Sequence, residues 1–384
     1  MTWMYRPFCF FLLFASLTLP GLGQSDSTQK EPGFLRRTFD RISGDSLPPG
    51  KTRYLVYPTI GYAPETSFEL GLSLVSFFYA KEDYKKNRLS EVQLWTFLTL
   101  ERQYGIWIEQ AIYGNEDKWF FLGRIRQQRF PLLYYGIGPE TSGEEPFLVD
   151  ANYTLIRQRV LRKVAPNLFF GVEGDFQRLY KAEFEPALTP LPLGGDGTLN
   201  LGLGLGLVYD SRHNVLNERD ATFAELAFLS YQPGWGSEYS FSAWYMDARY
   251  FRPMTLDKKQ VLAAQFFGTV TNGEVPFNQL ALLGGEQMMR GYYSGRYRDK
   301  TYMSAQVEYR FLPFPFSKRF GGAAFLSVGG VAPSVSDLRL NQFQPAGGIG
   351  LRYLVFPQKD IFMRLDVGFT REGPGFYFFT GESF

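Results

Sequence analysis

Apolar and polar residues alternate one by one along most of this chain beyond residue 50. In residues 301–311, for example, Met303, Val307 and Phe311 stand at apolar positions, while Ser304, Gln306 and Glu308 fall between them. A period of two places successive side chains on opposite faces of a strand. The pattern therefore predicts strands with one face against an apolar phase and the other against a polar one.

No run of 18 apolar residues occurs after the first 23 residues, so the sequence encodes no membrane-spanning helix. Lipid cannot satisfy the hydrogen-bonding groups of an open sheet edge, so a membrane protein without helices must form a closed barrel. The predicted fold class is all-β.

Sixteen strands are predicted, an even number as expected for a single-chain bacterial barrel. Their ranges are 53–62, 66–80, 91–102, 104–113, 118–130, 150–163, 167–181, 199–207, 222–231, 239–251, 260–270, 301–311, 320–331, 346–356, 361–370 and 376–384. The long connections 131–148, 182–197, 271–300 and 332–345 all fall on one side, which is expected to be extracellular. Residues 51–384 are therefore predicted to form a 16-stranded antiparallel transmembrane β-barrel.

The composition fits this prediction. The chain contains 38 Phe and 24 Tyr residues, more than a soluble core needs, and aromatic belts at two membrane interfaces would use them. An aromatic-rich β-sandwich is the alternative. The formal net charge of +2 argues against nucleic acid as a partner.

The N-terminus is expected to direct export. Arg6 precedes an apolar segment that ends at Pro20, and small residues follow up to Gly23. This predicts a signal peptide over residues 1–23 with cleavage near Gly23, a flexible periplasmic segment over 24–50, and a final location in the outer membrane. Cys9, the only cysteine, lies in the predicted signal, so no disulfide or thiolate chemistry is expected.

The segment 282–300 interrupts the alternation and is the candidate functional centre. It holds four glycines, three tyrosines and four basic residues between two predicted strands. Its candidate site residues are Gly284, Gly285, Arg290, Gly291 and Tyr292.

Several motifs give the chain a family resemblance. They are residues 57–66, Tyr135-Gly-Ile-Gly138, Tyr209-Asp-Ser-Arg-His-Asn214, Arg290-Gly-Tyr292 after Gly284-Gly285, and residues 348–353 with 364–368. Together they resemble the BamA/TamA superfamily, also called the bacterial surface antigen family. In this resemblance Asp210, Arg212 and Asn214 correspond to a periplasmic-turn motif. Arg290-Gly-Tyr292 corresponds to the tip of an extracellular loop that folds into the lumen.

The resemblance implies that Arg290 pairs with an acidic residue of the barrel wall. Glu308 and Asp366 are the candidates, since both fall on predicted lumen faces, and a buried guanidinium must be paired. The family often has an acidic residue in a strand where this chain has Ser327, which departs from the usual pairing. A solvated loop arginine is the alternative for Arg290.

The last predicted strand ends in aromatic residues, including Phe376, Phe378 and Phe384. Such an end is similar to the assembly signal of outer-membrane barrels. The alternative is an ordinary buried C-terminal strand.

No catalytic or metal-binding pattern emerges. His213 is the only histidine and has no nucleophile pattern beside it, and one histidine supplies too few zinc ligands. The glycine-rich segment 202–206 lacks the Lys-Ser/Thr of a phosphate loop. We therefore expect no enzymatic activity, no metal and no cofactor.

Two function classes stay open. The first is a factor in outer-membrane biogenesis that assists insertion or translocation of proteins or lipids. Its expected partners are outer-membrane lipids and either an assembly complex or client proteins. Residues 24–50 are too few for a POTRA domain, so the resemblance is to members with the barrel alone. The second class is a passive pore or structural barrel, although an inward-folded loop would obstruct a simple channel.

Overall fold

The computed structural model describes residues 51–83, 85–212, 217–357 and 360–384. The predicted residues 1–23 and 24–50, including the cleavage position near Gly23, lie outside this part of the chain, as do His213 and Asn214. No helix among the described residues has the length and hydropathy to cross a membrane.

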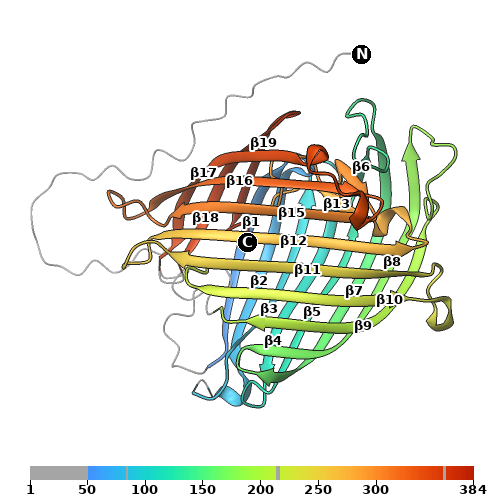
Figure 1. Ribbon diagram of the computed structural model, residues 1–384. Helices are drawn as coiled ribbons and strands as arrows, with labels where there is room; N and C mark the ends of the chain where they lie inside the picture. Colours follow the sequence, from blue (N-terminus) through green and yellow to red (C-terminus); the bar gives the residue numbers. More distant parts are fainter. Residues whose placement is uncertain (1–50, 84, 213–216, 358–359) are drawn as a thin grey trace, which may run out of the picture.

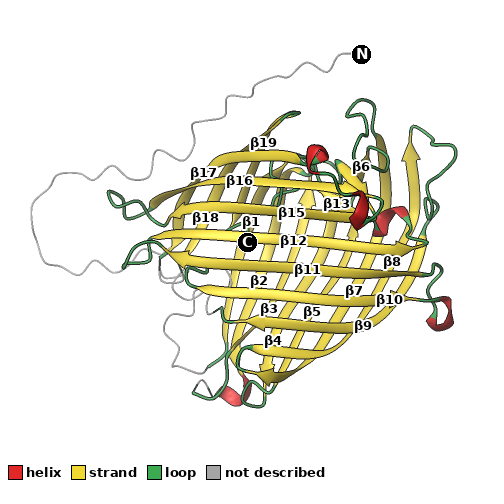
Figure 2. Ribbon diagram, in the orientation of Figure 1, coloured by secondary structure: helices red, strands yellow, loops and turns green. Residues whose placement is uncertain are grey.

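The described residues form one closed antiparallel barrel (Figures 1 and 2). Its strands are β1 (Arg53–Ala63), β2 (Ser67–Tyr79), β3 (Leu89–Thr99), β4 (Tyr104–Gly114), β5 (Trp119–Arg129), β7 (Phe147–Ala165), β8 (Leu168–Glu185), β9 (Thr198–Asp210), β10 (Ala221–Tyr231), β11 (Phe241–Pro253), β12 (Gln260–Gly273), β15 (Thr301–Phe311), β16 (Phe320–Ala332), β17 (Gln344–Phe356), β18 (Ile361–Thr370) and β19 (Gly373–Thr380). Each pairs with its neighbours in sequence order, and β19 returns to β1. This confirms the predicted 16-stranded all-β barrel.

Short elements lie in the connections. β6 (Leu132–Tyr134) adds to the edge of β7, while β13 (Ala281–Leu283) and β14 (Tyr297–Asp299) form a separate small hairpin. Five 3-10 turns of three residues each, η1 (Ala80–Glu82), η2 (Pro233–Trp235), η3 (Phe277–Gln279), η4 (Val335–Asp337) and η5 (Leu340–Gln342), complete the described elements.

Alternation determines which side chains face inward. On β9, Leu203 and Leu205 are about half exposed on the outer wall, at 49% and 48%. The glycines between the leucines leave room inside, since a Cβ at Gly202 would lie 2.6 Å from the ring of Tyr231. The outer surface is thus apolar, and the lumen is filled by large and polar side chains.

Four strand predictions need correction, and three of them concern the neighbouring strands β7, β8 and β9. β7 begins before the predicted 150–163, and β8 ends after the predicted 167–181. The hairpin of these two strands continues past the barrel rim, where Leu148 pairs with Glu185. β9 extends to Asp210, which was predicted to lie in a turn.

The fourth correction concerns the C-terminus. β19 ends at Thr380, not at Phe384. Residues 381–384 leave the sheet and turn into the lumen, where Glu382 forms a salt bridge with Arg352 at 2.9 Å. A buried countercharge holds these residues away from the sheet edge.

Candidate functional site

The segment between β13 and β14, residues 284–296, is here called the inner loop. Its two flanking strands pair with each other, Leu282 opposite Arg298. Apolar side chains anchor the loop in a cluster with the barrel wall, composed of Ala281, Leu283, Met288, Met289, Tyr292, Tyr297, Tyr302, Val331 and Ala346. Burial of this cluster fixes the loop inside the barrel.

Arg290 is fully buried at the tip of the inner loop. Its Nη1 donates to Oδ2 of Asp366 on β18 at 2.5 Å, and its Nη2 donates to Oε2 of Glu308 on β15. The guanidinium carbon lies 3.5 Å from the ring centroid of Phe325 on β16. The structure therefore brings Arg290 together with both acidic residues that the sequence singled out.

The two carboxylates are shared with other arginines of the wall. Glu308 accepts from Nε of Arg310 at 2.7 Å, and Asp366 accepts from Nη1 of Arg352 at 2.5 Å. Asp366 also accepts from Arg364 at 3.1 Å. A buried charge is tolerated only when it is paired and hydrogen-bonded. Removal of one member would leave an uncompensated charge inside the barrel.

Glycines make room for this network. A Cβ at Gly350 would lie 2.0 Å from Oδ1 of Asp366, and one at Gly368 would lie 2.4 Å from the carbonyl oxygen of Arg290. Gly291 has φ +114°, a conformation that favours glycine, and a Cβ there would lie 2.5 Å from Thr370. Gly284 and Gly285 are also left-handed, at φ +111° and +124°.

Serine at position 327 does not replace an acidic partner. Its hydroxyl lies 3.4 Å from the carbonyl oxygen of Ala346 and hydrogen-bonds to it. The face of Phe325, two residues earlier, contacts Arg290 instead.

The barrel closes at a short seam. β1 pairs with β2 along its whole length, from Arg53 to Ala63, whereas β1 and β19 share a single register pair, Tyr62 with Phe378. Phe378 belongs to the predicted C-terminal signal, and Phe376 on the same outward face is 49% exposed. The wall has far fewer backbone hydrogen bonds here than at its other strand boundaries.

The inner loop contacts both sides of this seam. On the β1 side, the backbone N–H of Ser294 donates to Oε1 of Glu65 at 2.5 Å. On the β19 side, the backbone N–H of Gly291 donates to the hydroxyl of Tyr377 at 2.9 Å. We call these two contacts the seam brace.

A salt bridge extends this contact to the turn between β18 and β19. Arg296 lies 2.7 Å from Glu372 in that turn, and the hydroxyl of Tyr297 donates to Glu372 at 3.0 Å. Arg296 also donates to the carbonyl oxygen of Thr141, and its guanidinium lies 4.9 Å from the Tyr135 ring. Arg296 thus joins three connections at the same end of the barrel: the inner loop, the β18–β19 turn and the loop that contains Thr141.

Glu65 lies in the β1–β2 turn, outside the spanning strands, and is 5% exposed. Burial, reinforced by the nearby carboxylate of Glu286, raises the pKa of Glu65 to about 7. Its Oε2 atom has no hydrogen-bond partner among the described residues. Sequence reasoning missed Glu65, because nothing in a short turn marks a residue whose partner is 229 positions away.

The remaining predicted site residues lie elsewhere. Arg212 pairs with Asp210 at 3.0 Å and stacks on the Phe223 ring at 4.0 Å, at the short-turn end of the lumen. Phe384 is buried in the lumen, where its backbone oxygen accepts from Arg310 at 3.2 Å. Phe384 is therefore not on the outer wall with Phe376, contrary to the predicted strand.

Among the described residues, no group of three or more His, Cys, Asp or Glu side chains could hold a metal ion.

An apolar outer wall, a charged lumen and a loop folded inward around a buried arginine define an integral outer-membrane β-barrel. The family comparison agrees: residues 50–384 match the Omp85 superfamily domain. The chain belongs to the Omp85 superfamily.

Solved structures share the fold at low sequence identity. BamA from Haemophilus ducreyi lacking POTRA domains 1–3 superposes with a TM-score of 0.56 at 13% identity, covering 86% of this chain and 70% of that one. CdiB from Acinetobacter baumannii gives 0.55 at 11%, covering 86% and 59%. CdiB from Escherichia coli gives 0.56 at 12%, covering 88% and 63%. No curated protein sequence matches the chain. Residues 51–384, as far as they are described, lie in the barrel and its connections and include no POTRA domain.

Proposed function

We propose that this protein is an outer-membrane biogenesis factor that assists insertion or translocation of outer-membrane proteins or lipids through the seam between β1 and β19. The observation that carries the proposal is the single register pair, Tyr62 with Phe378, at the closure. A strand boundary with so few backbone hydrogen bonds opens at lower cost than any fully paired one. An open seam would expose strand edges, which template the pairing of an incoming strand.

The inner loop gives the seam a support that does not depend on strand pairing. Ser294 donates a hydrogen bond to Glu65 on the β1 side, and Gly291 donates one to Tyr377 on the β19 side. Arg290 fixes the loop to the barrel wall. Loss of the seam brace and of the contacts of Arg296 and Tyr297 with Glu372 would free the seam, while the Arg290 network keeps the loop in place. The protein can therefore change its seam without unfolding its core.

Family membership and the resemblance of the barrel to BamA and CdiB support this proposal at the level of fold. We further propose that clients or an assembly complex meet the barrel wall directly at this seam. No enzymatic step is part of the proposal.

The passive-pore alternative fits the lumen less well. The inner loop occupies one end of the lumen. At the other end, Asn217 and Arg219 hydrogen-bond to Asp360, which lies 143 and 141 positions further along the chain. A wide, steady channel requires an unobstructed lumen.

Depletion followed by rescue tests the proposal. Cells depleted of the protein would be complemented with wild type, with Arg290→Ala, or with Arg339→Ala, an exposed loop arginine, as the matched control. We expect a defined set of outer-membrane proteins or surface lipids to fall on depletion and to return with wild type and Arg339→Ala only. Unchanged levels of every client class would refute the biogenesis function. A large ion conductance insensitive to inner-loop changes would establish the pore instead.

A further inference from the structure

Three glutamines of neighbouring strands lie on the apolar outer wall: Gln110, Gln127 and Gln158. Gln127 is paired there with Thr154 and Tyr180. Even-numbered residues of β4 point away from the lumen, where Tyr104 and Ile106 are 48% and 50% exposed. Odd-numbered residues point inward, as Glu109 shows by its 2.8 Å salt bridge to Arg126. Gln110 is therefore on the lipid side of β4.

Gln158 occupies the same row two strands away. Gln110 pairs in register with Gly123 on β5, and Gly123 pairs with Gln158 on β7. A Cβ at Gly123 would lie 2.4 Å from Oε1 of Gln158, so the side chain of Gln158 lies over this glycine. There it accepts a hydrogen bond from Nε2 of Gln110 at 2.6 Å.

The two amides differ in what remains unpaired. Gln158 also donates to the backbone oxygens of Leu122 at 3.3 Å and Arg159 at 3.1 Å, so both of its polar atoms are used. Gln110 makes only the bond to Gln158 among the described residues. Its Oε1 and one N–H therefore face the hydrocarbon with no partner, at a cost of several kcal/mol in lipid.

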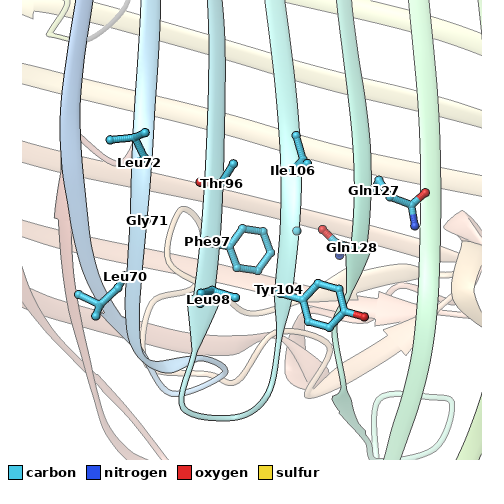
Figure 3. Close-up of a pocket in the computed structure, with 11 residues that line it drawn as sticks. Leu70, Gly71, Leu72, Thr96, Phe97, Leu98, Tyr104, Ile106, Gln127 and Gln128 are labelled. Atoms are coloured by element: carbon cyan, nitrogen blue, oxygen red, sulfur yellow. The ribbon is translucent and has the colours of Figure 1, made fainter.

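The same outer wall is hollowed nearer the start of β4. A groove of about 590 Å³ crosses β2 to β5 and is lined by Leu70, Leu72, Leu98, Tyr104, Ile106 and Gln127, among others (Figure 3). Ile106 and Gln110 lie on the same outward face of β4, so the groove and the unpaired amide belong to one surface.

On β15 and β16, on the other side of the seam, the outer wall has no comparable unpaired amide among the outward residues named below. Outward residues of β15 are Met303, Ala305 and Val307, and those of β16 include Leu326 and Val328. Polar side chains inside a membrane face a polar partner far more often than lipid. The β4–β5 face differs from the β15–β16 face in carrying an amide without such a partner.

We propose that the β4–β5 face is where a second copy of this chain docks, with a two-fold axis along the membrane normal beside Gln110. An amide with one free donor and one free acceptor is complementary to itself. A two-fold axis places the same residue of both copies face to face, so each Gln110 Oε1 would accept the free N–H of the other. An axis along the normal keeps both barrels in the same membrane orientation.

The seam remains accessible in this arrangement. β1 is three strands from β4 around the wall, so the second barrel lies to one side of the β1–β19 boundary. The proposed dimer therefore does not depend on the function proposed above, and insertion activity can be measured separately on monomeric and dimeric protein.

Cysteine cross-linking of the full-length protein in native outer membranes tests the docking face. Cys9 is the only native cysteine and is replaced by serine throughout. Ile112→Cys places a thiol on the same outward face, two residues from Gln110, and Ala305→Cys places one on β15 as the matched control. With a short bis-maleimide we expect a band at twice the monomer mass for Ile112→Cys and none for Ala305→Cys.

Gln110→Leu in the Ile112→Cys background tests the role of the amide. We expect the dimer band to be lost, while Thr96→Val, which removes a hydroxyl from neighbouring β3, leaves it unchanged. Heat-modifiable migration on gels checks that every variant is folded. Equal cross-linking of the two cysteine positions, a dimer that survives Gln110→Leu in folded protein, or a cross-linked product of another mass would each overturn the proposal. The comparison of the two cysteine positions remains decisive if Gln110→Leu does not fold.

Discussion

Arg290 and Asp366 are 76 positions apart in the chain, yet their side chains meet at 2.5 Å inside the barrel. The contact joins the inner loop to β18, the strand next to the last one. The next residue of the loop, Gly291, donates a hydrogen bond to Tyr377 on β19, the strand that forms the seam with β1. The inner loop therefore connects the buried charge network to the seam.

Replacement of Arg290 by alanine is expected to destabilise the barrel strongly. It would leave Glu308 and Asp366 with fewer positive partners in a buried site, and loss of one partner of a buried ion pair costs about 3–5 kcal/mol. Arg290→Lys should restore only part of this, since one ammonium cannot span both carboxylates as a guanidinium does. Urea unfolding followed by gel migration measures the effect, with Arg339→Ala as the control. Equal midpoints for Arg290→Ala and wild type would contradict the assigned role.

Gly291→Ala is expected to displace the inner loop. The substitution adds both the strain of φ +114° and a Cβ 2.5 Å from Thr370, and backbone strain alone costs about 1–3 kcal/mol. Gly236→Ala is the matched control, because Gly236 has φ +102° with no atom within 4 Å of the added Cβ. A larger loss of thermal stability is expected at 291 than at 236. Similar losses would show that space around Gly291 does not matter.

The seam brace is expected to weaken as pH rises. The pKa of Glu65 is about 7 in the braced state, above the ordinary value of 4.5 for a glutamate exposed to water. The braced state therefore binds the Glu65 proton more tightly, and this stabilisation is fully present below pH 4.5 and lost as pH rises through about 7. Hydrogen exchange of residues 290–298 should accelerate between pH 5 and pH 8, after correction for intrinsic exchange.

Glu65→Gln should remove this pH dependence, because its amide oxygen accepts from Ser294 without titrating. Glu82→Gln, at an exposed glutamate, serves as the control and should keep the wild-type profile. An unchanged profile in Glu65→Gln would assign the pH effect to another group.

The alternation predicted most of the barrel, because a half-buried wall imposes a period of two on every strand. It also placed Glu308 and Asp366 on inward faces, since each has apolar neighbours on both sides. It could not show that both meet Arg290, because that depends on how strands separated in the chain lie around the lumen. The sequence alone gave no sign of the Glu65 contact or of the inward turn at residues 381–384. Both depend on buried partners, Ser294 and Arg352, that no local pattern identifies.

A reversible lock of the seam tests the central claim most directly. Tyr62 and Phe378 form the only register pair between β1 and β19, so Tyr62→Cys with Phe378→Cys, in a chain with Cys9→Ser, places two thiols across it. Wild type and the oxidised and reduced double variant would be reconstituted in liposomes, and folding of an unfolded outer-membrane barrel into those liposomes would be followed. We predict that the oxidised variant loses the acceleration given by wild type and that reduction restores it. Full activity of the oxidised, cross-linked protein would contradict a function that depends on opening this seam.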